Sequence, residues 1–400
     1  MIHSDDVPVV PGFLAAAVHA GIKPYPVKDL ALIVSDPPAR AVGVFTSNSV
    51  KAAPVLLTGA RIRSGCCKAV IVNSGNANAC TGDRGFRDAM AMCRWTSRAM
   101  GADEGAVFVC STGVIGVPLP VAKIRKAIPK LVRILRPDGI PEVVQAIRTT
   151  DRFPKFLWEK TVVGGRSVTV CGIAKGAGMI CPNMATMLAY FLTDLNAPVP
   201  VLRELLKTGV AKSFNRINVD GDGSTNDTVL LLANGVAGNP PVVHGSRGYD
   251  AFRSTLHHIM EELARMIVRD GEGSTKTVDI VVRNARTNAD ARKIAYHIAN
   301  SSLVKTSFYG EDMNWGRIIV AVGCSNPHIE QDKIDIWYNA TKVVKGGVSA
   351  GRPQEERARK VLKQPSFTIT VDLHMGKGLY SVLTSDLSHE YITLNASYRS

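Results

Sequence analysis

Four hundred residues suffice for two or three domains with buried cores, and 46% hydrophobic with 20% charged residues is typical of a globular protein. The formal net charge is +14, but the basic residues are spread along the chain and aromatic residues reach only 6%, which argues against a surface for single-stranded nucleic acid. No apolar run reaches the ~18 residues that a membrane helix needs, and the start lacks the layout of a secretory signal, so a cytoplasmic protein is expected.

The eight cysteines and nine histidines form no metal-binding pattern. There is no Cys-x-x-Cys pair and no His-Glu-x-x-His motif, and the adjacent Cys66 and Cys67 suit neither zinc nor an easy disulfide. We therefore expect reduced thiols and no metal. The spacing of a nucleotide-binding phosphate loop is also missing, so no nucleotide is expected.

Apolar patterning predicts alternating strands and helices up to the turn Asp270–Gly273. Short apolar runs indicate buried strands, and apolar residues at every third or fourth position indicate amphipathic helices. The strands are expected at 31–34, 41–45, 68–72, 106–110, 186–192 and 227–233, and the helices at 84–100, 199–213 and 252–267.

A second, smaller α/β domain is predicted after this turn. Its strands are expected at 278–282, 333–337, 366–373 and 391–395, and its helices at 289–301 and 355–364. Glycine and proline are dispersed and do not form a linker. The predicted domains are therefore 1–276 and 277–400, packed tightly together.

A hydroxyl residue, Thr186, follows Ala185 at the start of a predicted buried strand, after a turn-forming stretch of Gly, Pro and Asn. Its hydroxyl could attack the preceding carbonyl, shift the acyl group from nitrogen to oxygen and cut the chain. The released α-amine would titrate near ~8 and could act as general base for the same hydroxyl. An Ala-Thr step before an apolar strand is common, so the pattern alone favours a structural role.

Five segments of the chain match, in order, the signatures of one enzyme family. They are Ser111–Gly116, Lys175–Leu188, Asp270–Lys276, Tyr309–Arg317 and Leu394–Ser400. In these segments, and over nearly its whole length, the chain resembles the ornithine acetyltransferases. These are the glutamate N-acetyltransferases of arginine biosynthesis, and some members also act as N-acetylglutamate synthases.

The resemblance implies a layered α/β/β/α fold, with helices outside two central sheets, followed by the smaller α/β domain. It also implies self-cleavage between Ala185 and Thr186 into an α chain of 1–185 and a β chain of 186–400. The two chains would stay associated because both contribute strands to one core and both supply the site. An α2β2 assembly is the expectation from the family.

Acyl transfer needs a nucleophile, a base and hydrogen-bond donors for the tetrahedral oxyanion. The resemblance assigns the first two roles to Thr186 and the oxyanion hole to the Thr112 hydroxyl and the Gly113 backbone N–H. Glycine suits this role because no Cβ blocks the approach of a substrate oxygen. Considered alone, a Ser-Thr-Gly segment after a strand is more often a turn or a helix cap.

The resemblance further implies substrate contacts from Thr186, Lys175, Glu272, Asn395 and Ser400. Lys175 suits the α-carboxylate of an N-acetyl amino acid, although the pattern alone favours a solvated surface lysine. Glu272 suits a substrate ammonium group. Asn395 and Ser400 would close the site, and Ser400 stands where many family members end in threonine.

One position departs from the family pattern. The family usually has Thr-Thr-Asp-Thr where this chain has Thr149-Thr150-Asp151-Arg152, and the last threonine of that motif contacts substrate. Arg152 adds bulk and charge at this position. It is predicted either to bind a substrate carboxylate or to turn away and leave the role to a neighbour.

The reaction implied by the resemblance is ping-pong transfer of an acetyl group from N2-acetyl-L-ornithine to L-glutamate through an acetyl-threonine. No cofactor or metal is expected, and acetyl-CoA could serve as a second acetyl donor. The excess positive charge would help to attract the anionic substrate.

Two other functions are weighed against this one. A self-processing amidohydrolase or aminopeptidase would give the acyl group to water, and Lys175 and Glu272 argue against it because they suit an amino-acid acceptor. A non-catalytic basic protein would bind nucleic acid with a steep salt dependence. The transferase is favoured over both, with no nucleic-acid or membrane partner.

Overall fold

The structure is a computed structural model that describes residues 7–181, 187–325 and 328–397. The described residues form two compact units, the first from 7–215 and 222–267 and the second from 216–221 and 268–397. The chain therefore leaves the first unit at residue 216, returns at 222 and leaves it again at 268. The domain limit predicted between residues 276 and 277 lies inside the second unit.

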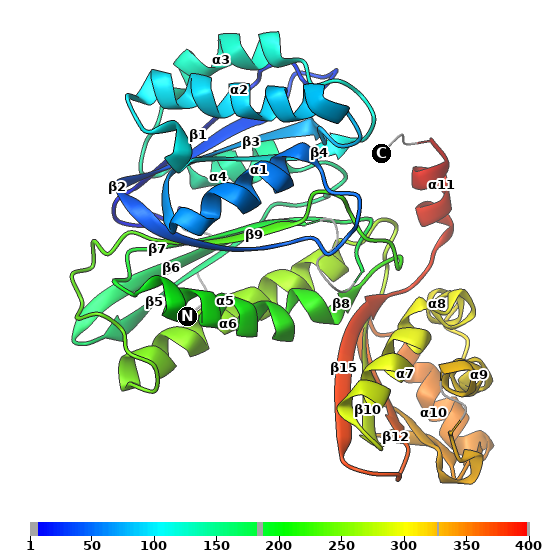
Figure 1. Cartoon of the computed structure of the whole chain (residues 1–400). Coiled ribbons are helices and arrows are strands. Elements are labelled where there is room, and N and C mark those ends of the chain that lie inside the picture. The colour runs from blue at the N-terminus through cyan, green and yellow to red at the C-terminus, as the bar shows by residue number, and fades with distance from the viewer. Residues whose placement is uncertain (1–6, 182–186, 326–327, 398–400) are drawn as a thin grey trace. The chain divides into compact units, whose positions relative to one another are not determined.

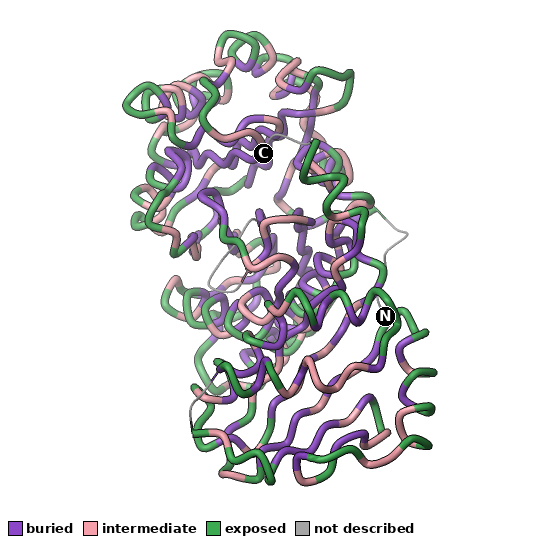
Figure 2. The backbone as a smooth tube through the Cα atoms, turned by 90° about the vertical axis from the view of Figure 1, so that its right-hand side faces the viewer, coloured by how far each residue is buried: buried purple, intermediate pink, exposed green. Residues whose placement is uncertain are grey.

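The first unit is built on one eight-stranded sheet. The strands follow the order β4-β3-β2-β9-β7-β6-β5, and β1 pairs with β2 beside this path. Their bounds are β1 (Phe13–Val18), β2 (Leu30–Phe45), β3 (Cys66–Asn76), β4 (Val107–Val114), β5 (Lys155–Val163), β6 (Arg166–Lys175), β7 (Leu188–Thr193) and β9 (Thr228–Ala233). Every residue of β7 and β9 is buried, and Figure 2 shows such buried stretches along the chain. Strands buried on both faces read as continuous apolar runs, which is why the sequence predicts both.

The long strand β2 divides this sheet into two layers. Its pairing with β3 shifts register between Val34 and Ala39, and its first part pairs with β1 while its second part pairs with β9. Apolar side chains of both layers meet in a core between them, among them Ile33 from one layer and Ile173 and Leu230 from the other. The two strands predicted at 31–34 and 41–45 are thus two parts of one strand.

Helices cover the outer face of each layer (Figure 1). On β6, Gly172 allows α6 to approach closely, because a Cβ there would lie 2.6 Å from Ile259 and 2.7 Å from Leu263. The first unit therefore has the expected layered α/β/β/α fold, with its layers joined through β2. The helices are α1 (Ala53–Arg61), α2 (Gly82–Met100) and α3 (Val121–Arg133) on one side, α5 (Val199–Lys212) and α6 (Arg247–Arg269) on the other, and α4 (Ile140–Ile147) in the core between the layers.

The second unit contains a seven-stranded sheet in the order β13-β12-β11-β14-β10-β15-β8. Its core joins the sheet to the helices through residues such as Ile280, Ile294 and Ile369. The strands are β8 (Ile217–Asn218), β10 (Thr277–Ala285), β11 (Asp335–Tyr338), β12 (Thr341–Lys345), β13 (Val348–Ser349), β14 (Ser366–Asp372) and β15 (Gly378–Ser385). The helices are α7 (Asn288–Asn300), α8 (Ser302–Tyr309), α9 (Trp315–Ser325), α10 (Arg352–Leu362) and α11 (His389–Ser397).

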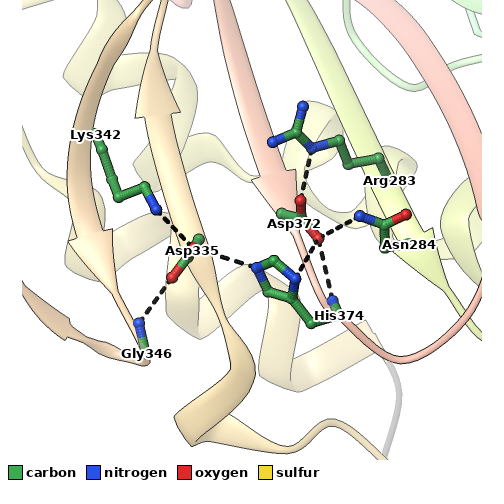
Figure 3. A network of polar contacts seen from close by, with 7 residues as sticks. All are labelled: Arg283, Asn284, Asp335, Lys342, Gly346, Asp372 and His374. Atoms are coloured by element: carbon green, nitrogen blue, oxygen red, sulfur yellow. Dashed lines mark hydrogen bonds and ion pairs between the residues drawn. The ribbon is translucent and has the colours of Figure 1, made fainter.

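A polar network joins β10, β11 and the segment after β14 in this second sheet (Figure 3). His374 lies between two carboxylates, with Nε2 3.2 Å from Asp335 Oδ2 and Nδ1 3.5 Å from Asp372 Oδ1. Arg283 donates to Asp372 at 2.7 Å, and Lys342 donates to Asp335 at 2.9 Å. Each carboxylate has cationic or N–H partners. The network therefore connects these strands while the carboxylate oxygens keep their hydrogen bonds and ion pairs.

The strand predicted at 391–395 is wrong, because these residues lie in helix α11. The β-branched and aromatic residues of this segment favour a strand, but the Ser388 hydroxyl accepts the Tyr391 N–H at 3.3 Å and caps the start of a helix. None of the α11 residues is buried. Without a sheet neighbour to bury its apolar residues, the local cap determines the structure.

The longest periodic segments are confirmed as helices: 84–100 lies in α2, and 199–213 and 289–301 each end one residue beyond α5 and α7. Among the described residues no helix is long and apolar enough to cross a membrane.

Candidate active site

Lys175 is the last residue of β6, and its side chain joins two threonine hydroxyls in the first unit. It is only 2% exposed. Its Nζ donates to Thr149 Oγ1 at 2.8 Å and to Thr112 Oγ1 at 3.2 Å. The pattern-based expectation of a solvated lysine is therefore wrong, and the structure brings Lys175 to Thr112 as the resemblance requires of two residues in one site.

Thr112 and Gly113 lie near the end of β4, beside the parallel strand β3. The pairing of the two strands becomes irregular at Gly75 and Asn76, opposite Thr112 and Gly113. Gly113 has φ +131°, and a Cβ built there would lie 2.4 Å from the carbonyl carbon of Gly75 and 2.5 Å from the nitrogen of Asn76. Only glycine fits this close approach of two backbones.

Beneath Lys175 lies a buried carboxylate, Asp151, which has no exposed side-chain surface. Its Oδ1 accepts from Lys155 Nζ at 2.7 Å and from the Gly176 N–H at 2.8 Å, and its Oδ2 accepts the Thr149 N–H at 3.0 Å. Burial alone would raise the pKa of Asp151, but Lys175 and Lys155 hold that pKa well below its usual range. Asp151 is therefore a fixed anion beneath the site.

A further buried lysine, Lys23, lies close enough to Lys175 for their charges to interact. Lys23 is 8% exposed and donates to the Arg148 carbonyl oxygen at 2.7 Å. Burial lowers the pKa of Lys23 to about 8 against the attraction of Asp29, and the charge of Lys175 acts in the same direction as burial. A group of cations that repel one another favours the binding of an anion such as a substrate carboxylate.

Asp227 precedes β9 and lies next to the start of β7. Its Oδ1 accepts the Met187 N–H at 2.7 Å. Burial raises the pKa of Asp227 well above its usual range, against the opposing effects of the Met187 N–H and of Lys175. Sequence reasoning missed this residue, because Asp227 follows a turn-rich stretch and reads there as one more turn residue.

Glu272 and Asn395 come together in the second unit. Asn395 Nδ2 donates to Glu272 Oε2 at 2.9 Å. Between them the backbone is closely packed: Gly273 has φ +66°, and a Cβ there would lie 2.4 Å from the nitrogen of Tyr391. The Ser388 hydroxyl also donates to the Gly273 carbonyl at 2.6 Å. The Asp-Gly-Glu-Gly segment and α11 therefore form one local structure.

Arg152 is exposed, whereas its neighbour Asp151 is buried. Within this motif, the threonine hydroxyl that Lys175 contacts belongs to Thr149, three positions before Arg152. Which of the two readings of Arg152 holds for a bound substrate stays a prediction. The predicted residues Ala185, Thr186 and Ser400 lie outside the described residues.

The chemistry of this arrangement is that of a site for developing negative charge. The ammonium group of Lys175 from β6 and the hydroxyl of Thr112 from β4 meet in a buried place next to Gly113, where electrostatic interactions are stronger than in water. Within the described part of the chain, no group of three or more His, Cys, Asp and Glu side chains could hold a metal ion.

The chain is similar over nearly its whole length to the proteins of one family. A model described as the ArgJ family matches residues 14–400. The "Arginine biosynthesis bifunctional protein ArgJ" of Geobacter sulfurreducens is 51% identical over 390 residues, which cover 98% of this chain and 99% of that protein.

Two solved structures are also similar in sequence. The arginine biosynthesis bifunctional protein argJ of Bacillus halodurans is 37% identical with a TM-score of 0.49, over 51% of this chain and 96% of that chain. Ornithine acetyltransferase from Mycobacterium tuberculosis, complexed with ornithine, is 41% identical with a TM-score of 0.41, over 44% of this chain and 94% of that chain.

Proposed function

Because the chain belongs to the ArgJ family and is an enzyme, we propose that it transfers the acetyl group of N2-acetyl-L-ornithine to L-glutamate. The observation that carries the proposal is the meeting of Lys175 and Thr112 next to Gly113. These groups can stabilise an oxyanion and hold a carboxylate, which are the two needs of acetyl transfer between amino acids.

The proposed reaction begins with self-cleavage between Ala185 and Thr186. The free α-amine of Thr186 then takes the proton of its own hydroxyl as that oxygen attacks the acetyl carbonyl. The Thr112 hydroxyl and the Gly113 N–H stabilise the tetrahedral oxyanion. When this intermediate collapses, its C–N bond breaks, ornithine leaves with the proton that the Thr186 α-amine had taken, and the acetyl-threonine ester remains. Glutamate attacks this ester in the second half-reaction, which gives N-acetylglutamate and regenerates Thr186.

The proposed substrate contacts are the residues that the resemblance identifies. Lys175 would bind the α-carboxylate, and Glu272 the ammonium group of the substrate, with Asn395 and Ser400 completing the site. Asn395 already donates to Glu272, which supports a joint role for these two. Arg152 is kept as a proposed contact, although its exposure favours Thr149 in that role.

The proposed enzyme uses no metal and no cofactor, since the amide already carries the acetyl group. Acetyl-CoA is proposed as a second donor that would acetylate the same threonine. We further propose that the two chains form an α2β2 assembly in the cytoplasm, a reducing compartment that suits eight free cysteines.

The test is an assay of the purified protein with N2-acetylornithine and glutamate, read by mass spectrometry of both products. The expected result is N-acetylglutamate formed in equal amount to ornithine, on protein whose intact mass shows two fragments meeting at Ala185–Thr186. Release of ornithine and acetate at the same rate without glutamate would instead indicate the hydrolase. A single uncut chain with no turnover would reject both functions.

A further inference from the structure

The carboxylate of Asp151 contacts both backbone segments that hold the ammonium group of Lys175. On one side it accepts the N–H of Gly176, which follows Lys175 in the chain, at 2.8 Å. On the other side it accepts the N–H of Thr149, whose own hydroxyl accepts from Lys175, at 3.0 Å. Asp151 thereby fixes the backbone that follows Lys175 and the backbone of the threonine that accepts one of its hydrogen bonds.

This arrangement has a consequence for Thr112. The ammonium group of Lys175 has three donors and no acceptor, so in its contact with Thr112 the hydroxyl oxygen must accept. The hydroxyl hydrogen of Thr112 then points away from Lys175 and is left to donate to another group. In the active site that group is the developing oxyanion.

We infer that Asp151 is a positioning residue of this site: by fixing Lys175 against Thr112, it orients the Thr112 hydroxyl as a donor toward the oxyanion. The inference rests on the proposed acetyl transfer and adds to it a residue that touches no substrate. Lys175 then has a second task besides substrate binding, because the same ammonium group sets the direction of the hydroxyl.

A simpler role for Asp151 would be to balance the buried charge of Lys155 in β5, which also has no exposed side-chain surface. That role needs only one carboxylate oxygen. In the structure Oδ1 is shared with Gly176, and Oδ2 is used for Thr149. These further contacts fix the residue that follows Lys175 and the threonine that Lys175 contacts. A residue that only balanced the charge of Lys155 would not need them.

The experiment is a double-mutant cycle on the full-length, processed protein. Asp151→Asn keeps the shape of the side chain but removes the carboxylate charge that pairs with the buried Lys155, so this variant could fail to fold. The variant Asp151→Asn/Lys155→Met removes both charges, and exchange of a buried ion pair for neutral groups is often tolerated. Lys155→Met alone is the matched control, because Asp151 keeps its contacts with Gly176 and Thr149 and its buried charge is still attracted by Lys175. Each variant is made with Thr112 and with Thr112→Val.

If Asp151 acts through the hydroxyl, the double variant should lower kcat by about 10- to 100-fold when Thr112 is present, part of the effect of a lost oxyanion donor. With Thr112→Val in place, the same change should lower kcat by less than about threefold, because the group that it orients is gone. Lys155→Met alone should stay within about threefold of the parent in both backgrounds.

Two results would overturn the inference. An equal loss with Thr112 and with Thr112→Val would mean that Asp151 acts on binding or folding independently of the hydroxyl, and no loss at all would mean that it acts on neither. The parent protein is assayed in parallel. If it forms no N-acetylglutamate, the proposed function fails; if it does and the cycle is additive, only the role of Asp151 fails.

Discussion

The ammonium nitrogen of Lys175 lies 3.2 Å from the hydroxyl oxygen of Thr112, although 63 positions separate the two residues in the sequence. The contact links the end of β6 to the end of β4. In the strand order of the first sheet, β4 is the first strand and four strands lie between it and β6. It places a cation and a hydroxyl group in one buried site, where the loss of either hydroxyl partner of Lys175 should affect activity.

Thr112→Val removes the hydroxyl while keeping the size of the side chain. We expect kcat to fall by about 10²–10³, the usual effect of losing one oxyanion donor. Thr112→Ser keeps a hydroxyl and is the control, with most of the activity retained. Steady-state kinetics with N2-acetylornithine and glutamate measure both, and a valine variant as fast as the serine variant would exclude Thr112 from the oxyanion hole.

Thr149→Val and Arg152→Ala compare the two residues that could make the third contact of the family motif. Thr149 accepts a hydrogen bond from Lys175, and Arg152 is exposed. We therefore expect Thr149→Val to lower kcat/KM by about 10-fold or more, the typical cost of losing one hydrogen bond from a buried charged donor. Arg152→Ala should change it by less than about threefold. The reverse order would restore Arg152 as the substrate contact.

Gly113→Ala tests the close approach of β4 to β3. The added Cβ would overlap the backbone of Gly75 and Asn76, and φ is +131°. We expect a loss of about 3 kcal/mol or more in the free energy of unfolding, since strain and overlap add. Gly116→Ala is the control, because Gly116 also has positive φ, at +78°, but its Cβ would meet nothing within 4 Å. Urea unfolding measures both, and equal losses would contradict the predicted overlap.

Lys305 in the second unit should make stability depend on pH. It donates to Thr384 Oγ1 at 3.1 Å and to the Ser385 carbonyl, and burial lowers its pKa from 10.5 to about 8 against the attraction of Asp386 and Asp220. Between these pH values the unfolded chain holds more protons than the folded one, so stability rises with pH in this window. Below pH 8 both states are protonated, and the full cost of burial is present.

Relative to Lys305→Met, the wild-type protein should therefore gain roughly 2 kcal/mol in the free energy of unfolding between about pH 7 and pH 9.5. Urea unfolding of both proteins at each pH gives this difference, and other titrating groups cancel. Lys345→Met, at an exposed lysine of the same unit, should show no such change. A constant difference between wild type and Lys305→Met would show that Lys305 keeps its ordinary titration.

The local sequence pattern predicts those helices and strands whose own apolar residues indicate which face is buried. Five consecutive apolar residues, 229–233, predict β9, and the repeat of Phe252, Leu256 and Ile259 predicts α6. The end of the chain shows the limit of this reasoning. Its β-branched residues favour a strand, but no neighbouring strand pairs with 391–395 among the described residues, and the Ser388 cap gives a helix.

The active site shows the same limit for polar residues. Motif resemblance identified Lys175 and Thr112, and the structure brings them together. The resemblance gave no role to Asp151, although Asp151 lies in a family motif, and it did not identify Asp227. Nothing local distinguishes a buried carboxylate from one in a solvated loop. Asp151 is buried by partners from other segments, such as Gly176 at 25 positions away, and only the folded sheet brings these together.

The strand order of the first sheet also constrains when the chain can be cut. With a break between Ala185 and Thr186, β7 and β9 belong to the second fragment, and they lie side by side between β2 and β6 of the first fragment. Neither fragment alone can complete this sheet, so folding has to precede the cut. Unfolding would then separate two molecules instead of one, and recovery of the cut enzyme from denaturant should depend on protein concentration, whereas recovery of an uncut variant should not.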